Sequence, residues 1–261
     1  MRAASVWLVD GRHWPDHILA PWLACLTEAE QQRYRRFIRP MRQREFLIGR
    51  ILLRFAVARL ANLAFTDIGV VDRKDNAPLP VLPDRLSKEI IDLPFLSLSH
   101  SRGWVACAVS VDTPLGLDIE ALDASRDVTS LGDIAFTCAE NQWLSQHKDA
   151  EKKAAFYALW SEREALYKMR SSADRPWSED ALVSDGIKLT SGSDWTLYSP
   201  LHSKLAICLC SRYAVSKPLL LELTGDSPFA WALQADGLPE TDVSFNQAFT
   251  QPFQALPTVL H

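Results

Sequence analysis

The stretch "LSLSHSRGWVACAVSVDTPLGLDIE" (Leu96–Glu120) decides the fold. Leucine and serine alternate at its start, which is typical of a β-strand with one buried face. Strand-forming residues then fill Trp104–Val111, and a turn over His100–Gly103 separates the two runs. A proline and a glycine interrupt the second run. Leu117–Glu120 is therefore predicted to be a third, short strand.

Helix signals lie on both sides of this stretch. Thr27 with Glu30, and Thr137 with Glu140, have the spacing of a capping box, which marks the start of a helix. Helices are expected at Thr27–Phe37, Arg42–Leu63, Asn141–Ser145 and Lys152–Met169. Further strands are expected at Val6–Val9, Gly186–Leu189, Trp195–Tyr198, Leu205–Cys210 and Leu219–Leu223, with a proline-punctuated loop at Lys74–Asp84.

The order of these elements predicts an α+β protein. A long helix followed by alternating strands occurs twice, although no strict sequence repeat is visible. The pattern divides near Thr113 and predicts two similar halves, 1–112 and 113–227, followed by a tail, 228–261.

Composition excludes several classes of protein. The chain has 261 residues, of which 48% are hydrophobic and 23% charged, as in ordinary soluble domains. No apolar run approaches the ~18 residues of a spanning helix, and the N-terminus lacks the pattern of a signal peptide. The five cysteines have no metal-type spacing. We therefore expect a cytoplasmic protein with no membrane partner and with reduced, mostly buried cysteines.

Charge is unevenly distributed along the chain. The formal net charge of -4 argues against a general nucleic-acid partner. Arginines nevertheless crowd one segment, with Glu45 the only acid among them. Arginine suits phosphate because its planar guanidinium donates two parallel hydrogen bonds. The segment contains Arg33, Arg35, Arg36, Arg39, Arg42, Arg44, Arg50 and Arg54, and predicts a local anion as ligand.

Asp118 and Glu120 stand two residues apart in the third strand. Residues i and i+2 of a strand point to the same face, so the two carboxylates converge. Two unpaired carboxylates at that distance repel, and a divalent cation removes the cost. Ligands that are all oxygen favour Mg²⁺ or Mn²⁺ over zinc. The alternative is an exposed strand end with two solvated acids.

A helix supplies another group of candidates. Trp160, Glu164 and Lys168 are spaced by four residues and share one helix face. Apolar neighbours suggest that Glu164 is partly buried. A third carboxylate facing Asp118 and Glu120 would complete a magnesium site, with Lys168 meeting Glu164 or a phosphate. The alternative is a surface Glu–Lys pair beside a core tryptophan.

His100 lies between two serines at the predicted turn. It is a candidate donor to a phosphate oxygen, and the alternative is a structural hydrogen bond to a backbone carbonyl. No G-x-S-x-G elbow, Walker loop or G-x-G-x-x-G word is present, which disfavours serine hydrolases and the common nucleotide folds. Together the candidates suit magnesium-assisted chemistry on a diphosphate.

In order and spacing, this set resembles the 4′-phosphopantetheinyl transferase superfamily, in particular the longer type that activates surfactin synthetase. Four words carry the resemblance: "LSLSHS" (Leu96–Ser101), "GLDIE" (Gly116–Glu120), "FTCAE" (Phe136–Glu140) and "WSEREALYK" (Trp160–Lys168). It extends over about Leu26–Leu209. It implies two α+β halves about a pseudo-two-fold, with coenzyme A in the cleft between them. Such an arrangement makes a monomer sufficient.

The resemblance also implies an activity. Members transfer the 4′-phosphopantetheine arm of coenzyme A to a serine of an apo acyl, peptidyl or aryl carrier protein, releasing adenosine 3′,5′-bisphosphate. Asp118, Glu120 and Glu164 match the metal-binding acids. Lys168 matches the lysine near the diphosphate, so that Glu164, Lys168 and Asp118 are the expected catalytic residues. By the same resemblance, the residues expected to bind coenzyme A are His100, Ser99, Arg44, Arg50 and Lys168.

The chain departs from the family pattern at several positions, among them the loop before the histidine. Members often carry Gly-Lys-Pro before the histidine, where this sequence reads Asn76-Ala77-Pro78. Two other functions stay open: a non-catalytic module that binds coenzyme A or a carrier protein, and a magnesium-dependent nucleotide-diphosphate hydrolase. Because carrier proteins are commonly acidic, Arg102 and Arg126 are candidates for docking one.

Overall fold

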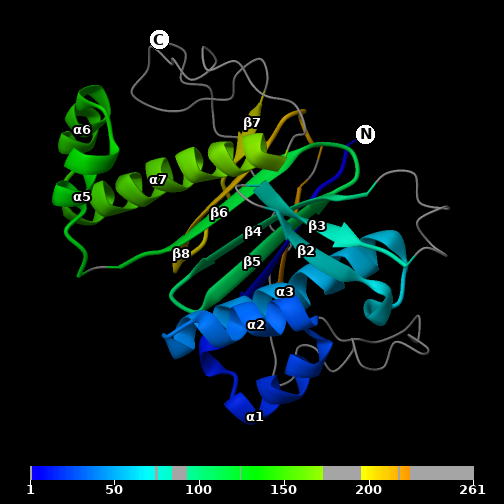
Figure 1. Ribbon diagram of the computed structural model, residues 1–261. Helices are drawn as coiled ribbons and strands as arrows, with labels where there is room; N and C mark the ends of the chain where they lie inside the picture. The colour runs from blue at the N-terminus through cyan, green and yellow to red at the C-terminus, as the bar shows by residue number, and fades with distance from the viewer. Residues whose placement is uncertain are drawn as a thin grey trace.

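A computed structural model describes residues 2–73, 76–83, 93–123, 125–172, 195–216 and 218–223 of the chain. It is an α+β structure, as the sequence predicts. Helices and strands lie in layers, with α3 (Pro40–Ala61) and α7 (Asp149–Ser172) on opposite sides of the strands (Figure 1). Among the described residues, no helix is both long enough and apolar enough to cross a membrane.

The first sheet has four strands in the order β4-β5-β1-β9. Strands β4 (Phe95–Ser101) and β5 (Trp104–Ser110) form the antiparallel hairpin that the alternation of leucine and serine predicts. β5 then pairs antiparallel with β1 (Ser5–Asp10). The long helix α3 covers one face of this sheet, and its apolar residues pack with those of β1 and β5 in the largest core cluster.

The fourth strand of this sheet comes from the far end of the described chain. β9 (Leu219–Leu223) runs parallel to β1, with Ser5 opposite Leu219 and Val9 opposite Leu223. A strand from beyond residue 113 thus completes a sheet whose other strands all precede that residue. The two parts of the sequence are therefore interlocked by a shared sheet.

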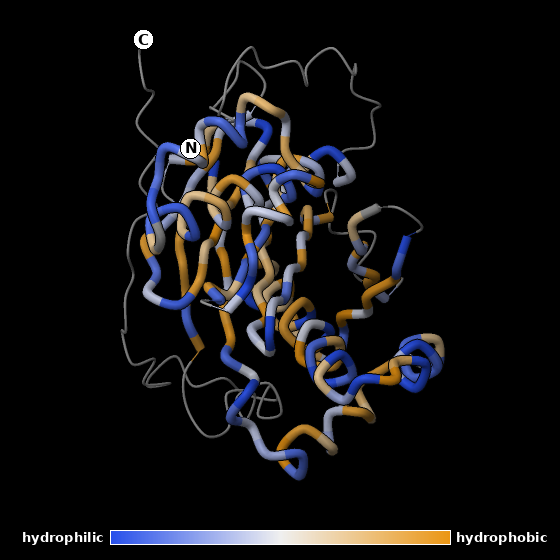
Figure 2. The backbone as a smooth tube through the Cα atoms, turned by 90° about the vertical axis from the view of Figure 1, so that its left-hand side faces the viewer, coloured by the Kyte–Doolittle hydropathy of each residue, from blue (hydrophilic) through white to orange (hydrophobic). Residues whose placement is uncertain are grey.

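The second sheet has three strands in the order β6-β8-β7. These are β6 (Leu115–Ala121), β8 (Leu205–Ser211) and β7 (Thr196–Tyr198). One face of it packs against the first sheet around buried Leu8, Trp104 and Leu117, and the other face packs under α7 around Met169. Figure 2 shows the apolar residues concentrated along the strands and on the inner sides of the helices.

The predicted capping boxes are confirmed at two helices. In α2 (Glu28–Arg36) the Thr27 hydroxyl accepts from the Glu30 amide while the Glu30 carboxylate accepts from the Thr27 amide. Thr137 and Glu140 do the same for α6 (Cys138–Ser145). A further helix, α5 (Val128–Ala135), begins at Asp127 and was not predicted. Short helical turns are also present: η1 (Gly11–His13), α1 (Asp16–Leu19), η2 (Ala20–Cys25) and η3 (Phe65–Asp67).

The loop predicted at Lys74–Asp84 is wrong in part, because residues 76–81 form a strand. β3 (Asn76–Val81) pairs antiparallel with β2 (Gly69–Arg73) in a separate two-stranded sheet. Three prolines suggested a loop, but the two that lie in β3 are tolerated because proline can occupy a strand that has a free edge. The expected strand at Gly186–Leu189 and the tail 228–261 lie outside the described residues. Three of the five cysteines are buried, and all five are free.

Candidate active site

The two sheets meet where β4 lies beside β6. The serines of the "LSLSHS" word use their hydroxyl oxygens to accept backbone N–H groups of β6. Ser97 accepts from Leu117 at 2.8 Å, and Ser101 accepts from Ala121 at 3.0 Å. Ser99 accepts from Ile119 at 3.2 Å. From Ser97 on, every second residue of β4 is a serine, and the three side chains lie on one face of the strand. Their hydroxyl oxygens serve as the hydrogen-bond acceptors for backbone N–H groups of β6, which therefore needs no backbone acceptor there.

Two of these serines also hold the two acids of β6. Ser99 donates its hydroxyl to Asp118 Oδ1 at 2.9 Å, and Ser101 donates to Glu120 Oε2 at 2.8 Å. Asp118 is buried, at 4% exposure, and Glu120 is half-buried. Burial, together with the nearby Asp118 carboxylate, raises the pKa of Glu120. The convergence of the two acids, expected from their i and i+2 spacing, is thus present and is fixed by β4.

Lys168 of α7 reaches the same place from the other side. Its Nζ donates to Asp118 Oδ1 at 2.7 Å and to Ser99 Oγ at 3.1 Å. Helix α7 comes this close because β6 carries Gly116 where the helix backbone passes. Asp118, Ser99 and Lys168, three of the sequence-predicted site residues, are therefore in direct contact.

Glu164 lies one turn before Lys168 on α7 and is half-buried. No hydrogen bond or ion pair joins it to Asp118 or Glu120 in the described part of the chain. Within that part, no three His, Cys, Asp or Glu side chains gather closely enough to hold a metal ion. The pair of β6 acids is thus assembled, and the role of Glu164 as a third ligand stays a prediction.

One atom in this cluster lacks a partner. Asp118 Oδ2 is buried and has no hydrogen bond, whereas Oδ1 receives both Lys168 and Ser99. A buried carboxylate oxygen without a donor is costly, and a cation at that position would remove the cost. The hard oxygen donors of Asp118 and Glu120 fit Mg²⁺ or Mn²⁺.

His100 stands at the end of β4 beside the α3 arginines. The Arg42 guanidinium contacts its ring, and Arg42 also pairs with Glu45, whose Oε2 lies 3.2 Å from His100 Nδ1. Glu45 is buried and its other oxygen accepts from the Gly103 amide at 2.9 Å. The acid that interrupts the arginine segment therefore joins α3 to the β4–β5 turn.

Burial and the Arg42 cation lower the pKa of His100 to about 4, so its imidazole is neutral at pH 7. In the unfolded chain the histidine takes up its proton near the usual pKa of about 6.5. As the pH falls from about 6.5 to about 4, protons bind the unfolded state preferentially and folding stability is lost. His100 therefore contributes a decrease in stability over this acidic window.

We expect His100→Gln to flatten the fall in stability between pH 6.5 and pH 4. The measurement is the denaturation midpoint in urea at each half unit of pH, for wild type and variant. Arg42, Glu45, Lys168 and Asp118 also face this ring and are common to both proteins. If the urea midpoints of wild type and variant fell in parallel from pH 6.5 to pH 4, the assignment of a neutral, buried imidazole would be contradicted.

Arg44 and Arg50, expected near the nucleotide, are engaged elsewhere in α3. Arg44 contacts the Asp16 carboxylate and the carbonyl oxygens of Gly11 and Trp14. Arg50 is 3% exposed and pairs with Asp72 and, at 3.6 Å, with Glu30. These contacts hold α3 to its neighbours. A role for either residue in binding coenzyme A stays a prediction.

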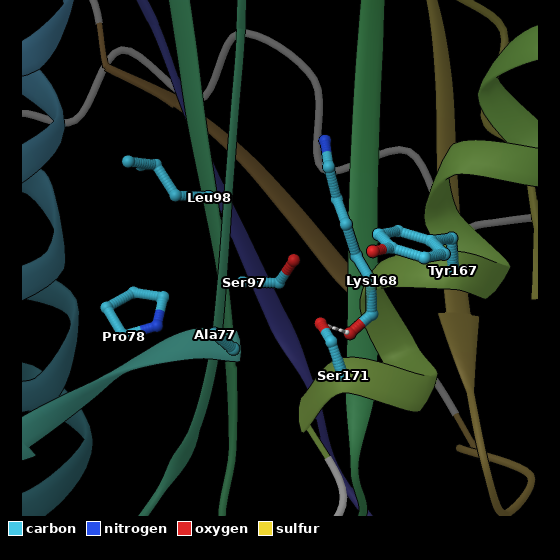
Figure 3. Close-up of a pocket in the computed structure, with 7 residues that line it drawn as sticks. All are labelled: Ala77, Pro78, Ser97, Leu98, Tyr167, Lys168 and Ser171. Atoms are coloured by element: carbon cyan, nitrogen blue, oxygen red, sulfur yellow. Dashed lines mark hydrogen bonds between the residues drawn. The ribbon is translucent and has the colours of Figure 1, made fainter. Parts of the chain in front are cut away.

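A cavity of about 250 Å³ opens beside Lys168. Figure 3 shows Ala77 and Pro78 of β3 on one side of it, with Tyr167, Lys168 and Ser171 of α7 on the other. Ser97 of β4 points into the space between them, whereas Leu98 points to the side on which Pro78 lies. Ala77, which stands where the family word has lysine, thus borders the same cavity as Lys168.

Comparisons with known proteins cover the part of the chain that holds this site. The sequence profile of the 4'-phosphopantetheinyl transferase superfamily matches residues 114–213, which include β6, α7 and both acids. Over these residues the chain is similar to this superfamily. It is 27% identical to the 4'-phosphopantetheinyl transferase HetI of Nostoc sp. over 187 residues, covering 70% of this chain and 76% of HetI.

Further relatives of the superfamily differ in coverage. The chain is 26% identical to the transferase psf-1 of Bacillus pumilus, across 81% of this chain and 82% of the relative. Against the transferase AcpT of Salmonella typhimurium the identity is 26%, and the chain spans 62% of that protein's length. Sequence reasoning overlooked Ser101, the last residue of the first family word, and named Arg42 only as one of the crowded arginines. Ser101 follows Ser99 at the same two-residue spacing as the acids, which is a signal that was present.

Proposed function

We propose that this chain transfers the 4′-phosphopantetheine arm of coenzyme A to a serine hydroxyl of an apo acyl, peptidyl or aryl carrier protein. Adenosine 3′,5′-bisphosphate is the other product. One contact carries the proposal: Lys168 Nζ of α7 lies 2.7 Å from Asp118 Oδ1 of β6, beside an unpartnered Oδ2. It joins a cation to one of the two converging carboxylates of β6, and a cation and carboxylates are the groups a diphosphate reaction requires.

The reaction exchanges one phosphorus–oxygen bond for another. The carrier serine oxygen attacks the phosphorus that bears pantetheine, and the bond from that phosphorus to the bridging diphosphate oxygen breaks. The electron pair leaves with adenosine 3′,5′-bisphosphate. The serine proton passes to a base, for which we propose Glu164, because it is half-buried on the same helix as Lys168 and has no hydrogen bond among the described residues.

Lys168 stabilises negative charge at the reacting phosphate. Its ammonium is held by Asp118 and Ser99, and its side chain is 27% exposed, so it stays accessible to a ligand in the adjoining cavity. A cation fixed in advance stabilises developing charge without reorganising as the reaction proceeds.

Asp118 and Glu120, with Glu164 as the third acid, would hold Mg²⁺ or Mn²⁺. When bound, the ion neutralises charge on the diphosphate and on the leaving phosphate. Asp118 Oδ2 has no hydrogen-bond partner, and the pKa of Glu120 is raised. Both observations support a cation at this position, because each shows a carboxylate whose negative charge is poorly compensated by its surroundings.

His100 and Arg42 form the donor group for a phosphate of coenzyme A. The His100 ring is 35% exposed and Arg42 is 36% exposed, so both are partly open to a ligand. A neutral imidazole can still donate one N–H to phosphate while the adjacent guanidinium supplies the charge. Ser99 orients the lysine and the acid, and Arg44 and Arg50 contribute to the positive potential of α3.

We further propose that 1–112 and 113–227 are related halves with the active site in the cleft between them, and that 228–261 is an appendage. The contacts between β4 and β6 support this position of the site, because they join the two parts at the acids. A monomer suffices for such a cleft, and a cytoplasmic setting suits a carrier-protein substrate.

One experiment tests the proposal against both alternatives. The protein is incubated with MgCl₂, coenzyme A and apo carrier proteins of the acyl, peptidyl and aryl kinds, and each carrier is weighed by mass spectrometry. We expect a carrier to gain the mass of phosphopantetheine. Coenzyme A binding with no mass gain would favour the non-catalytic module, and adenosine 3′,5′-bisphosphate formed without a carrier would favour the hydrolase.

A further inference from the structure

The surface around the β4–β5 turn combines exposed apolar side chains with arginines. We propose that this surface docks the carrier protein, through carboxylates and an apolar side chain on the carrier. This inference rests on the proposed function, and it says where on this chain the carrier protein binds. We call the surface the docking rim; it consists of Ile38, Arg39, Met41, Arg102, Leu122 and Arg126.

The apolar side chains of the docking rim are unusually exposed to solvent. Ile38 is 96% exposed, Met41 44% and Leu122 41%. Ile38 lies in the loop between α2 and α3, which is held in place because Gln43 donates to the Phe37 carbonyl at 2.9 Å. An isoleucine so exposed on a constrained loop has no role in the core, and its burial against a partner would be favourable.

Direct contacts join the rim into one surface. A Cβ added at Gly103 would come within 3.2 Å of Met41 Sδ, so Met41 packs over the β4–β5 turn. Arg102 of that turn pairs with Asp123, which follows Leu122 directly. The Arg126 amide donates to the Asp123 carbonyl at 3.4 Å. Figure 1 shows the β4–β5 turn beside the end of the α2–α3 pair.

The charge of the rim is opposite to that of the whole chain. The chain carries a formal net charge of -4, whereas the rim holds three arginines and is bordered by two acids, Asp123, whose side chain is 12% exposed, and Asp127, which caps α5. Arg39 has no ion pair within the described residues. An acidic partner is therefore repelled by the molecule at large and attracted here, which selects both the partner and its orientation.

The rim also adjoins the reacting groups. Ser101, next to Arg102, holds Glu120, and the positive charge of Arg126 acts on the Glu120 carboxylate. Arg42 lies over the ring of Phe37, the neighbour of Ile38, and contacts the ring of His100. A carrier seated on the rim would thus present its serine toward Asp118, Glu120 and Lys168, as the transfer requires.

The test separates affinity for the carrier from affinity for coenzyme A. Variants Ile38→Asp and Arg39→Glu/Arg126→Glu are assayed with an apo acyl carrier protein, or with whichever carrier the wild type modifies. We expect KM for the carrier to rise about tenfold in each, with KM and the calorimetric Kd for coenzyme A unchanged. Raising the salt concentration should weaken carrier binding to wild type more than to the double charge reversal.

Two matched controls lie far from the rim. Val111→Asp places a charge on another exposed apolar residue at the opposite end of β5, ~20 Å from the turn. Arg59→Glu reverses an exposed arginine in the last turn of α3, ~30 Å from Arg39. Both should keep the KM of wild type for the carrier.

The outcomes distinguish this inference from the function beneath it. If the wild type modifies a carrier and the rim variants keep its KM, the docking rim is wrong while the transferase assignment stands. If the wild type modifies no carrier at all, the proposed function itself fails.

Discussion

Replacing Asp118 with alanine is expected to lower kcat/KM for transfer by about 1,000-fold or more, equivalent to about 4 kcal/mol of transition-state stabilisation. The change removes both the oxygen that positions Lys168 and the unpartnered oxygen next to it. The Lys168 ammonium would keep Ser99 as a partner and would swing within the cavity. The measurement is the rate of mass gain by an apo carrier protein at saturating MgCl₂.

Two companion variants make this result specific. Asp118→Asn keeps the shape and an acceptor for the Ser99 hydroxyl, and it should still lose transfer because its charge is gone. Asp112→Asn changes an exposed acid that accepts the Ala3 amide at the start of the chain, and it should leave the rate unchanged. Titration calorimetry with MnCl₂ gives a second readout, since Asp118→Asn should weaken Mn²⁺ binding. Near-normal transfer by Asp118→Ala would remove the proposed reaction centre.

Short words of the sequence predicted the β4–β5 hairpin and the two capping boxes, because each depends on residues a few positions apart. The i and i+2 spacing of Asp118 and Glu120 likewise predicted their common face. Such local geometry follows from backbone periodicity alone. The resemblance to a family placed Lys168 near a diphosphate, and its contact with Asp118 in the structure was not predicted.

Non-local features were beyond this reasoning. The pairing of β9 with β1 joins residues more than two hundred positions apart and has no signal within either strand. Arginines of α3 were expected to face a ligand, yet Arg50 is buried against Asp72 and Glu30. The choice between a buried ion network and an open anion site depends on which acids the fold brings near, and composition does not encode it.

The glycine of the "GLDIE" word shows how packing determines the site. A Cβ on Gly116 would lie 2.0 Å from the Ala165 carbonyl oxygen and 2.2 Å from the Met169 amide nitrogen. Both atoms belong to the backbone of α7, so the clash cannot be relieved by rotating a side chain. The helix would have to move away from β6. Lys168 lies on that helix between the two contact points, and its bond to Asp118 depends on the close approach.

We therefore expect Gly116→Ala to lower the free energy of unfolding by about 3 kcal/mol and to lose transfer in the fraction that stays folded. The measurements are urea denaturation and the carrier mass assay at a temperature where the variant is folded. Gly49→Ala is the matched control, because its new Cβ would meet only the flexible end of Leu98, at 3.0 Å, in the middle of α3. Alanine there gains helix propensity of up to about 1 kcal/mol, so that variant should stay within about 1 kcal/mol of wild type. A Gly116→Ala protein as stable and active as Gly49→Ala would mean that α7 does not rest on β6 as described, and that the position of Lys168 has another cause.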